Sequence, residues 1–132
     1  MERLGVDLIY MSEELEEELF KKFPWFVTND GEIVFCNVGV GWYYLLVGML
    51  TEIEEHFKLM NKSIDRLSFS EIKEKHGLLR VYTNNSISGL QQILRKYEFL
   101  SEHVCEICGN KGELRDRSWS VVLCDRCLLN GY

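Results

Sequence analysis

The chain has 132 residues, of which 46% are hydrophobic and 12% aromatic, and its formal net charge is −6. Such a composition supplies the core of one small domain and excludes general disorder. The acidic charge disfavours general affinity for nucleic acid, because that affinity depends on the neutralisation of phosphates.

The longest apolar stretch, residues 38–50, holds three glycines and is shorter than the ~20 residues that a membrane-spanning helix needs. The N-terminus lacks the basic, apolar and small-residue progression that marks a targeting signal. We therefore expect a soluble protein of the bacterial cytoplasm with no membrane partner.

A helix is predicted after Ser12, because serine caps helix N-termini and acidic side chains are favoured in the first turns. Lys21 and Lys22 lie near its other end, and Pro24 stops it. Residues 1–66 hold thirteen acids and six bases, so the acidic charge is concentrated there. The helix offers either an acidic face for a partner protein or an ordinary solvated surface, made by Glu13, Glu14, Glu16, Glu17 and Glu18.

Residues 32–35 are predicted to form a short strand, followed by a long apolar helix from Trp42 to about residue 61. This helix is expected at the centre of the core, and Gly48 within it indicates that another element packs closely there. The aromatic residues of this region are interpreted either as core or as a protein-binding surface: Trp25, Phe26, Trp42, Tyr43 and Tyr44.

Residues 67–83 alternate between apolar and polar side chains around a turn at residues 76–77, which predicts a β-hairpin. The alternation slips after Phe69, so a bulge or a shorter first strand is expected. Residues 84–86 are predicted to cap a third helix. The fold class is therefore α+β, with about three helices on a small antiparallel sheet.

Two Cys-x-x-Cys pairs follow, Cys105 with Cys108 and Cys124 with Cys127, and their spacing is typical of a structural zinc site. Four thiolates suit zinc because it accepts a closed tetrahedral shell of soft ligands. Gly109 supports a tight knuckle after the first pair, since such a turn uses a backbone angle that glycine adopts cheaply. Two disulfides or a redox pair are the weaker alternatives, because neither a signal peptide nor a thioredoxin-like unit accompanies the cysteines.

These cysteines define a predicted zinc module, residues 103–132, docked on an α+β body formed by residues 1–102. A hairpin predicted at residues 114–123 indicates a treble-clef or ribbon-like finger that holds one structural zinc ion. His103 lies just before the first pair, but four cysteines already complete the shell. Cys36, next to an apolar strand, is interpreted as a buried small hydrophobe rather than a nucleophile.

Four stretches carry further motifs, namely Gly41-Trp42-Tyr43, KEKHGLLRVY at residues 73–82, CEICG and GELR between residues 105 and 115, and LCDRC at residues 123–127. Together they resemble a family of small phage and prophage proteins, over roughly residues 40–128. The family often has Phe and Gly where this chain has His76 and Leu78, so the shape of that turn is expected to differ. The resemblance implies a phage-related origin and a metal at the four cysteines, and it implies no established activity.

A basic patch is the candidate for contacts with nucleic acid or with a partner, because zinc modules use arginine and aromatic side chains on phosphates and bases. Its members are Arg115, Arg117, Trp119 and Arg126 on the zinc module, extended by Lys73, Lys75 and Arg80 on the other hairpin. In the alternative interpretation Trp119 packs the zinc module on the body, and the arginines pair with nearby acids: Glu113, Asp116 and Asp125. His56 and His76 have no partners at metal-ligand spacing and are interpreted as ordinary polar positions.

The sequence contains no recognisable set of nucleophile, base and acid, so the protein is interpreted as a non-enzyme. We expect a zinc-containing, protein-binding modulator, encoded by a phage, that inhibits or redirects a host protein of defence or of nucleic-acid handling. Its acidic face would compete with DNA or RNA for a basic groove. The alternatives are a nucleic-acid-binding zinc-finger protein and a small enzyme such as a nuclease.

Overall fold

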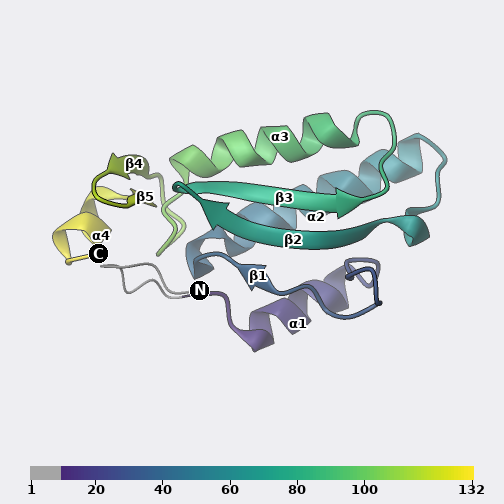
Figure 1. The fold of residues 1–132 in the computed structure, drawn as a ribbon, viewed down its shortest axis with the longest axis horizontal. Coiled ribbons are helices and arrows are strands. Elements are labelled where there is room, and N and C mark those ends of the chain that lie inside the picture. Colours follow the sequence, from purple (N-terminus) through teal and green to yellow (C-terminus); the bar gives the residue numbers. More distant parts are fainter. Residues whose placement is uncertain (1–9) are drawn as a thin grey trace.

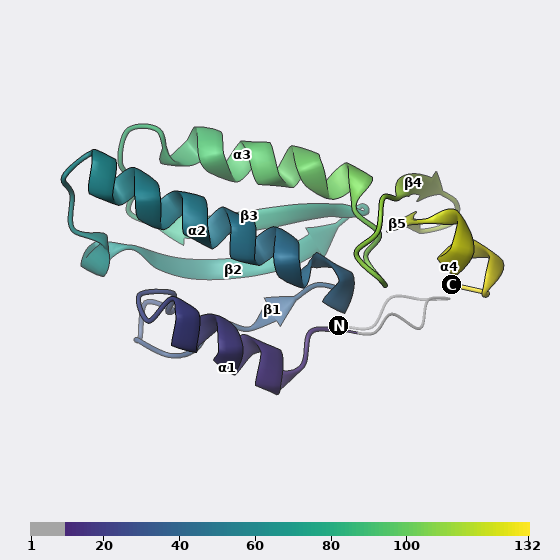
Figure 2. The same cartoon turned by 180° about the vertical axis from the view of Figure 1, so that it is seen from behind.

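The computed structural model describes residues 10–132, which have the predicted α+β class. In chain order the elements are α1 (Glu13–Lys22), β1 (Cys36–Asn37), α2 (Tyr43–Leu59), β2 (Ser68–Lys75), β3 (Leu78–Asn84), α3 (Leu90–Leu100), β4 (Glu113–Asp116), β5 (Ser120–Leu123) and α4 (Asp125–Leu129). Short 3₁₀ turns precede α2 and β2 and follow α3. α2 and α3 lie side by side over one face of the sheet, and α1 lies near β1, away from α3 (Figures 1 and 2). The segment from β4 to α4 lies beyond one end of the sheet.

The main sheet has the order β1-β2-β3 and is mixed. β2 and β3 form the predicted antiparallel hairpin, with its turn at residues 76–77 and a bulge between Phe69 and Glu71. β1 runs parallel to β2, with Cys36 opposite Ile72, so the expectation of a wholly antiparallel sheet is wrong at this edge. The reason is that α2 forms a crossover between β1 and β2, and a helical crossover joins parallel strands.

α1 begins after Ser12, whose Oγ accepts the N–H of Leu15 at 3.3 Å, as predicted. The strand predicted at residues 32–35 is reduced to an isolated bridge between Val27 and Ile33. A tight turn between these two residues folds the segment back on itself, so that the paired strand β1 begins only afterwards.

α3 begins at Leu90, later than the cap predicted at residues 84–86. The asparagines of that segment donate their side-chain N–H groups to Ser68 and Arg66 instead, and so tie the loop to the start of β2. The helix starts from Gly89, whose φ of 92° lies in the left-handed region that glycine adopts without strain.

The hydrophobic core lies between the sheet and the two long helices, with Trp42 fully buried at the start of α2. α2 is central, as predicted, and its buried apolar face includes Leu46, Met49, Leu50, Ile53 and Phe57. Each such side chain contributes roughly 1.5–3 kcal/mol by leaving water. Gly48 lies against Tyr97 of α3, where a Cβ would be 3.4 Å from the ring, which confirms the predicted close packing.

The aromatic residues around the start of α2 divide between core and surface. Trp42 and Phe26 are fully buried and Tyr43 nearly so, as the core interpretation predicts. Trp25 is half-buried and donates its indole N–H to a glutamate of α2 at 2.7 Å. Tyr44 is 80% exposed, so it is the member of this group that a partner protein can contact.

Candidate metal centre

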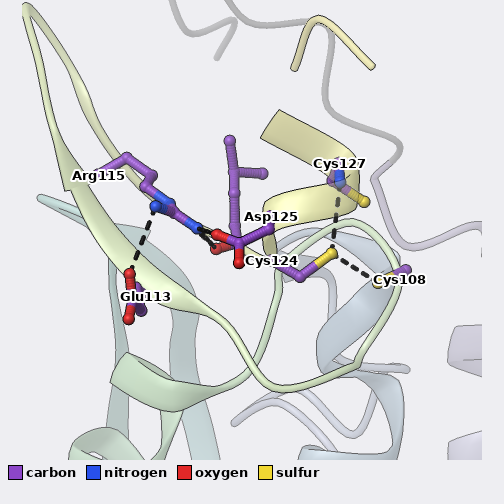
Figure 3. Close-up of polar contacts among 7 residues, drawn as sticks. Cys108, Glu113, Arg115, Cys124, Asp125 and Cys127 are labelled. Atoms are coloured by element: carbon purple, nitrogen blue, oxygen red, sulfur yellow. Dashed lines mark hydrogen bonds and ion pairs between the residues drawn. The ribbon is translucent and has the colours of Figure 1, made fainter. Parts of the chain in front are cut away.

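The four cysteines of the two Cys-x-x-Cys pairs come together beyond the end of the main sheet. The Sγ atoms of Cys105, Cys108, Cys124 and Cys127 all lie within 4.8 Å of one another. Figure 3 shows three of these residues, with the sulfurs of Cys108 and Cys124 3.6 Å apart. Thiolates bound to one zinc ion at ~2.3 Å lie about 3.8 Å from each other. The cysteines therefore form a group that can hold a metal ion such as zinc.

The first pair lies on a tight backbone turn. The N–H of Gly109 donates to the C=O of Cys105 at 2.9 Å, and the N–H of Cys105 donates to the C=O of Asn110 at 2.7 Å. Gly109 has a φ of 82°, in the left-handed region, as expected for the glycine of a metal knuckle. The turn therefore presents the sulfurs of Cys105 and Cys108 to one point.

The second pair lies where β5 gives way to α4. Cys124 is the N-cap of α4, and its Sγ accepts the N–H of Cys127 at 3.4 Å, which lowers the pKa of Cys124 to about 7. Burial raises the pKa of Cys108 and of Cys127, so metal binding there must displace protons. A knuckle, a β4–β5 hairpin and a cysteine pair on a short helix have the arrangement of a treble-clef finger.

Four sulfur ligands would complete a tetrahedral shell around a zinc ion and leave no open position for a substrate, as in structural zinc sites. His103 stands outside the group, and its ring packs edge-on against Phe99 with the ring centres 5.8 Å apart. Within residues 10–132 no second group of three or more metal-ligating side chains is close enough to hold an ion. Cys36 lies in the main core, as predicted, and burial raises the pKa of its thiol.

Glu106, inside the first cysteine pair, attaches the metal site to the chain segment before α2. Its buried Oε2 accepts the N–H of Gly39 at 3.0 Å, and its backbone C=O accepts the N–H of Gly41 at 2.9 Å. Trp42 adds an indole N–H bond to the C=O of Val104 at 2.8 Å. A side chain at either glycine would overlap the backbone around Glu106. Docking of the cysteine segment on the body was predicted, but these contacts were not, and the two glycines before Trp42 are their signal in the sequence.

Arg115 on β4 is held within the metal module, which is the predicted zinc module of residues 103–132. Its guanidinium lies 2.9 Å from Asp125 and 3.4 Å from Glu113, and it donates to the C=O of Leu123 (Figure 3). Ion pairs with exposed carboxylates contribute about 0–1 kcal/mol each. These contacts favour the interpretation in which Arg115 pairs with nearby acids, and they hold β4 against the turn that carries Cys124.

The other members of the predicted basic patch differ in whether they contact other side chains. Arg117 lies over the ring of Trp119, 3.9 Å from its centre, and Trp119 packs on the apolar cluster of the metal module rather than on the body. Lys73 and Arg80 each form an ion pair with a glutamate, at 3.0 and 3.9 Å. Two further cations are exposed and form no ion pair with the carboxylates of residues 10–132: Lys75 and Arg126. Half of the predicted cations are therefore already neutralised.

α1 presents acidic side chains to solvent, with one exception. Glu13, Glu14, Glu17 and Glu18 are exposed, as a partner face requires. Glu16 is buried, and its Oε2 accepts the N–H of Cys36 at 2.6 Å, so its inclusion in that face is wrong. The reason is helical periodicity, which places Glu16 on the same side as the fully buried Leu19. Burial raises the pKa of the Glu16 carboxyl.

A groove of about 830 Å³ lies between α1, the start of α2 and the metal knuckle. It is lined by Leu15, Glu18 and Lys22 of α1, by Val40, Gly41, Tyr43, Tyr44 and Leu45, and by Val104 and residues 107–110. Concave sites with apolar walls and a few polar groups are typical of ligand and peptide binding. The cysteine knuckle therefore forms one wall of the groove.

Comparison of the chain with protein-family models, with curated proteins and with solved structures gives no match in any of the three. The resemblance to phage proteins therefore stays a prediction carried by its motifs. In the part of the chain from residue 10 onward, no helix is long and apolar enough to cross a membrane.

Proposed function

We propose that this protein is a zinc-containing modulator that acts by binding another protein, with zinc as a structural ion. The observation that carries the proposal is the convergence of four thiols within 4.8 Å, two of them on a turn that also forms a wall of the surface groove. In this scheme the ion fixes the wall, and the groove receives a segment of the partner.

Zinc is the ion that best suits the donor set, because it prefers soft thiolates in a closed tetrahedral shell. Apart from its cysteines, the metal module buries few side chains in a cluster of its own, mainly Ile107, Val121 and Leu123. Structural zinc contributes about 10–16 kcal/mol to the folding of small zinc modules at neutral pH. The ion, rather than this small cluster, is therefore the expected source of order in the module.

The charge of the groove and its rim selects the partner. Glu18 lines the groove, and Glu13, Glu14 and Glu17 are exposed on the same helix. Lys22, the only basic residue of the lining within residues 10–132, lies 5.8 Å from the centre of the Tyr43 ring. Tyr44 adds an exposed aromatic surface of the kind that anchors protein interfaces. We therefore assign the groove to a basic segment of a partner protein that also carries apolar side chains.

The finer parts of the proposal rest on the sequence. The motif resemblance supports a phage origin, and with it a host protein of defence or nucleic-acid handling as the partner that is inhibited or redirected. A nucleic-acid-binding zinc finger has less support, because half of its candidate cations are paired with carboxylates. Four thiolates and one Zn²⁺ together also add −2 to the formal charge of −6.

The test is a pull-down from nuclease-treated bacterial lysate, washed at about 0.5 M salt, where phosphate contacts are heavily weakened. The wild type is compared with Tyr44→Ser and with Leu59→Ser, two exposed positions of α2 of which only the first lines the groove. We expect one stoichiometric protein that Tyr44→Ser loses and Leu59→Ser retains. Equal capture by both variants, or recovery of nucleic acid alone, would refute a partner site in the groove.

A further inference from the structure

A second cavity, of about 460 Å³, lies between the α2–β2 loop and the β3–α3 loop. These loops are at the opposite end of the sheet from the metal module (Figures 1 and 2). The buried side chains of Phe57 and Leu67 line the cavity, together with the partly buried Ile87. The cavity therefore has an apolar floor that is separate from the groove beside the metal centre.

Hydrogen bonds hold the walls of this cavity in place. The side chain of Asn85 donates to the C=O of Arg66 at 2.8 Å, which joins the two loops. The N–H of Lys62 donates to the C=O of Phe57 at 3.0 Å, which fixes the first loop to the end of α2. Asn85 itself has a φ of 65°, a conformation that asparagine tolerates better than most residues. The cavity is thus built from defined turns.

Two cations, Lys62 and Arg66, line the rim and form no ion pair with any carboxylate of residues 10–132. By contrast, Lys73, Lys96 and Arg115 all pair with carboxylates. Residues 58–66 hold three bases and one acid, in a chain whose net charge is −6. This loop segment is therefore locally positive, and among residues 10–132 no acidic side chain lines the cavity.

We propose that the cavity binds a small phosphate monoester whose organic group is apolar or aromatic. The volume lies within the ~300–1,000 Å³ typical of small-molecule sites, and such sites combine apolar walls with a few polar groups. Lys62 and Arg66 bind the phosphate, since guanidinium and ammonium groups make charge-assisted hydrogen bonds to its oxygens. Phe57, Leu67 and Ile87 contact the organic group. This site is independent of the metal and of the groove beside it.

The experiment is an NMR titration of the ¹⁵N-labelled, zinc-loaded full chain with three probes: phenyl phosphate, phenol and inorganic phosphate. We expect phenyl phosphate to shift the amides of residues 62–67 and 85–87 saturably, and to bind at least about tenfold more tightly than either of the other probes. Equal affinity for inorganic phosphate would overturn the role of the apolar floor. Absence of saturable shifts at these residues would overturn the site.

Variants test the two cations directly. Lys62→Ala and Arg66→Ala should each weaken phenyl phosphate binding by about tenfold or more, because each removes a charge-assisted hydrogen bond. Lys58→Ala is the matched control, since Lys58 is exposed on the last turn of α2 and lies outside the lining. All three side chains are exposed, so the amide spectrum of each variant should retain the wild-type fold. Unchanged affinity in both cavity variants, or an equal loss in the control, would refute the assignment.

Discussion

Glu106 lies between two metal-site cysteines, and its carboxylate accepts the backbone N–H of Gly39 at 3.0 Å. This bond joins residues 67 positions apart in the sequence, at a point where both groups are buried. The metal knuckle is therefore attached to the segment that enters the central helix α2. Loss of either side of this bond should disturb both the core and the metal site.

Glu106→Ala is predicted to destabilise the protein by about 1–3 kcal/mol, because it leaves the buried N–H of Gly39 without its acceptor. The measurement is the free energy of unfolding from urea titrations of the zinc-loaded protein. Glu55→Ala is the control, since Glu55 is exposed on α2, and it should change stability by less than about 0.5 kcal/mol. Equal stabilities for the two variants would show that the Glu106 contact contributes nothing.

Cys124→Ser is predicted to remove the bound metal and to unfold at least residues 105–132, because three thiolates and a hydroxyl no longer form the closed shell. Metal analysis of the wild type should give one zinc per chain, and a strong chelator should have the same effect as the mutation. Cys36→Ala is the matched control, because that thiol lies in the main core, away from the four-cysteine group. A Cys124→Ser protein that keeps one zinc per chain would contradict this metal site.

The four-cysteine group and most helices were predictable because local spacing determines them. Two Cys-x-x-Cys pairs are enough to predict the cysteine group, and an N-cap residue such as Ser12 is enough to predict where a helix begins. The parallel pairing of β1 was not predictable, since a strand of two residues carries no periodic signal and depends on where α2 returns the chain. Glu16 and Glu106 were missed for a related reason: each is a buried carboxylate whose partner is a backbone N–H far away in the sequence.

Glycine-to-alanine changes at two positions are predicted to have different effects on the free energy of unfolding. A Cβ at Gly41 would overlap the carbonyl oxygen of Cys105, so Gly41→Ala should destabilise the protein by more than about 2 kcal/mol. A Cβ at Gly48 would meet the Tyr97 ring at 3.4 Å, an ordinary contact, while alanine gains up to about 1 kcal/mol in helix propensity. Gly48→Ala should therefore be neutral or stabilising. Thermal unfolding of the two zinc-loaded variants checks the contrast, and a larger loss at Gly48 would contradict it.

The buried carboxyl of Glu16 makes stability depend on pH in a defined direction. Its pKa is raised above the usual value of 4.5, chiefly because burial disfavours the charged form, although the N–H of Cys36 opposes this. In the window between 4.5 and the folded-state pKa, the native state binds more protons than the unfolded state. The contribution of Glu16 to stability is therefore fully present below that window and is lost as the pH rises through it.

Glu16→Gln should abolish the pH-dependent contribution of this residue to stability, because the amide keeps an oxygen for the N–H of Cys36 and does not titrate. The free energy of unfolding of Glu16→Gln relative to the wild type should therefore increase as the pH is raised from 5 to 8. Glu17→Gln is the control on the exposed side of α1, where the same difference should stay flat. Both variants keep the four cysteines, so any pH-dependent loss of metal cancels in the comparison. A difference that falls with rising pH would mean that the folded protein favours the charged form of Glu16, contrary to its burial.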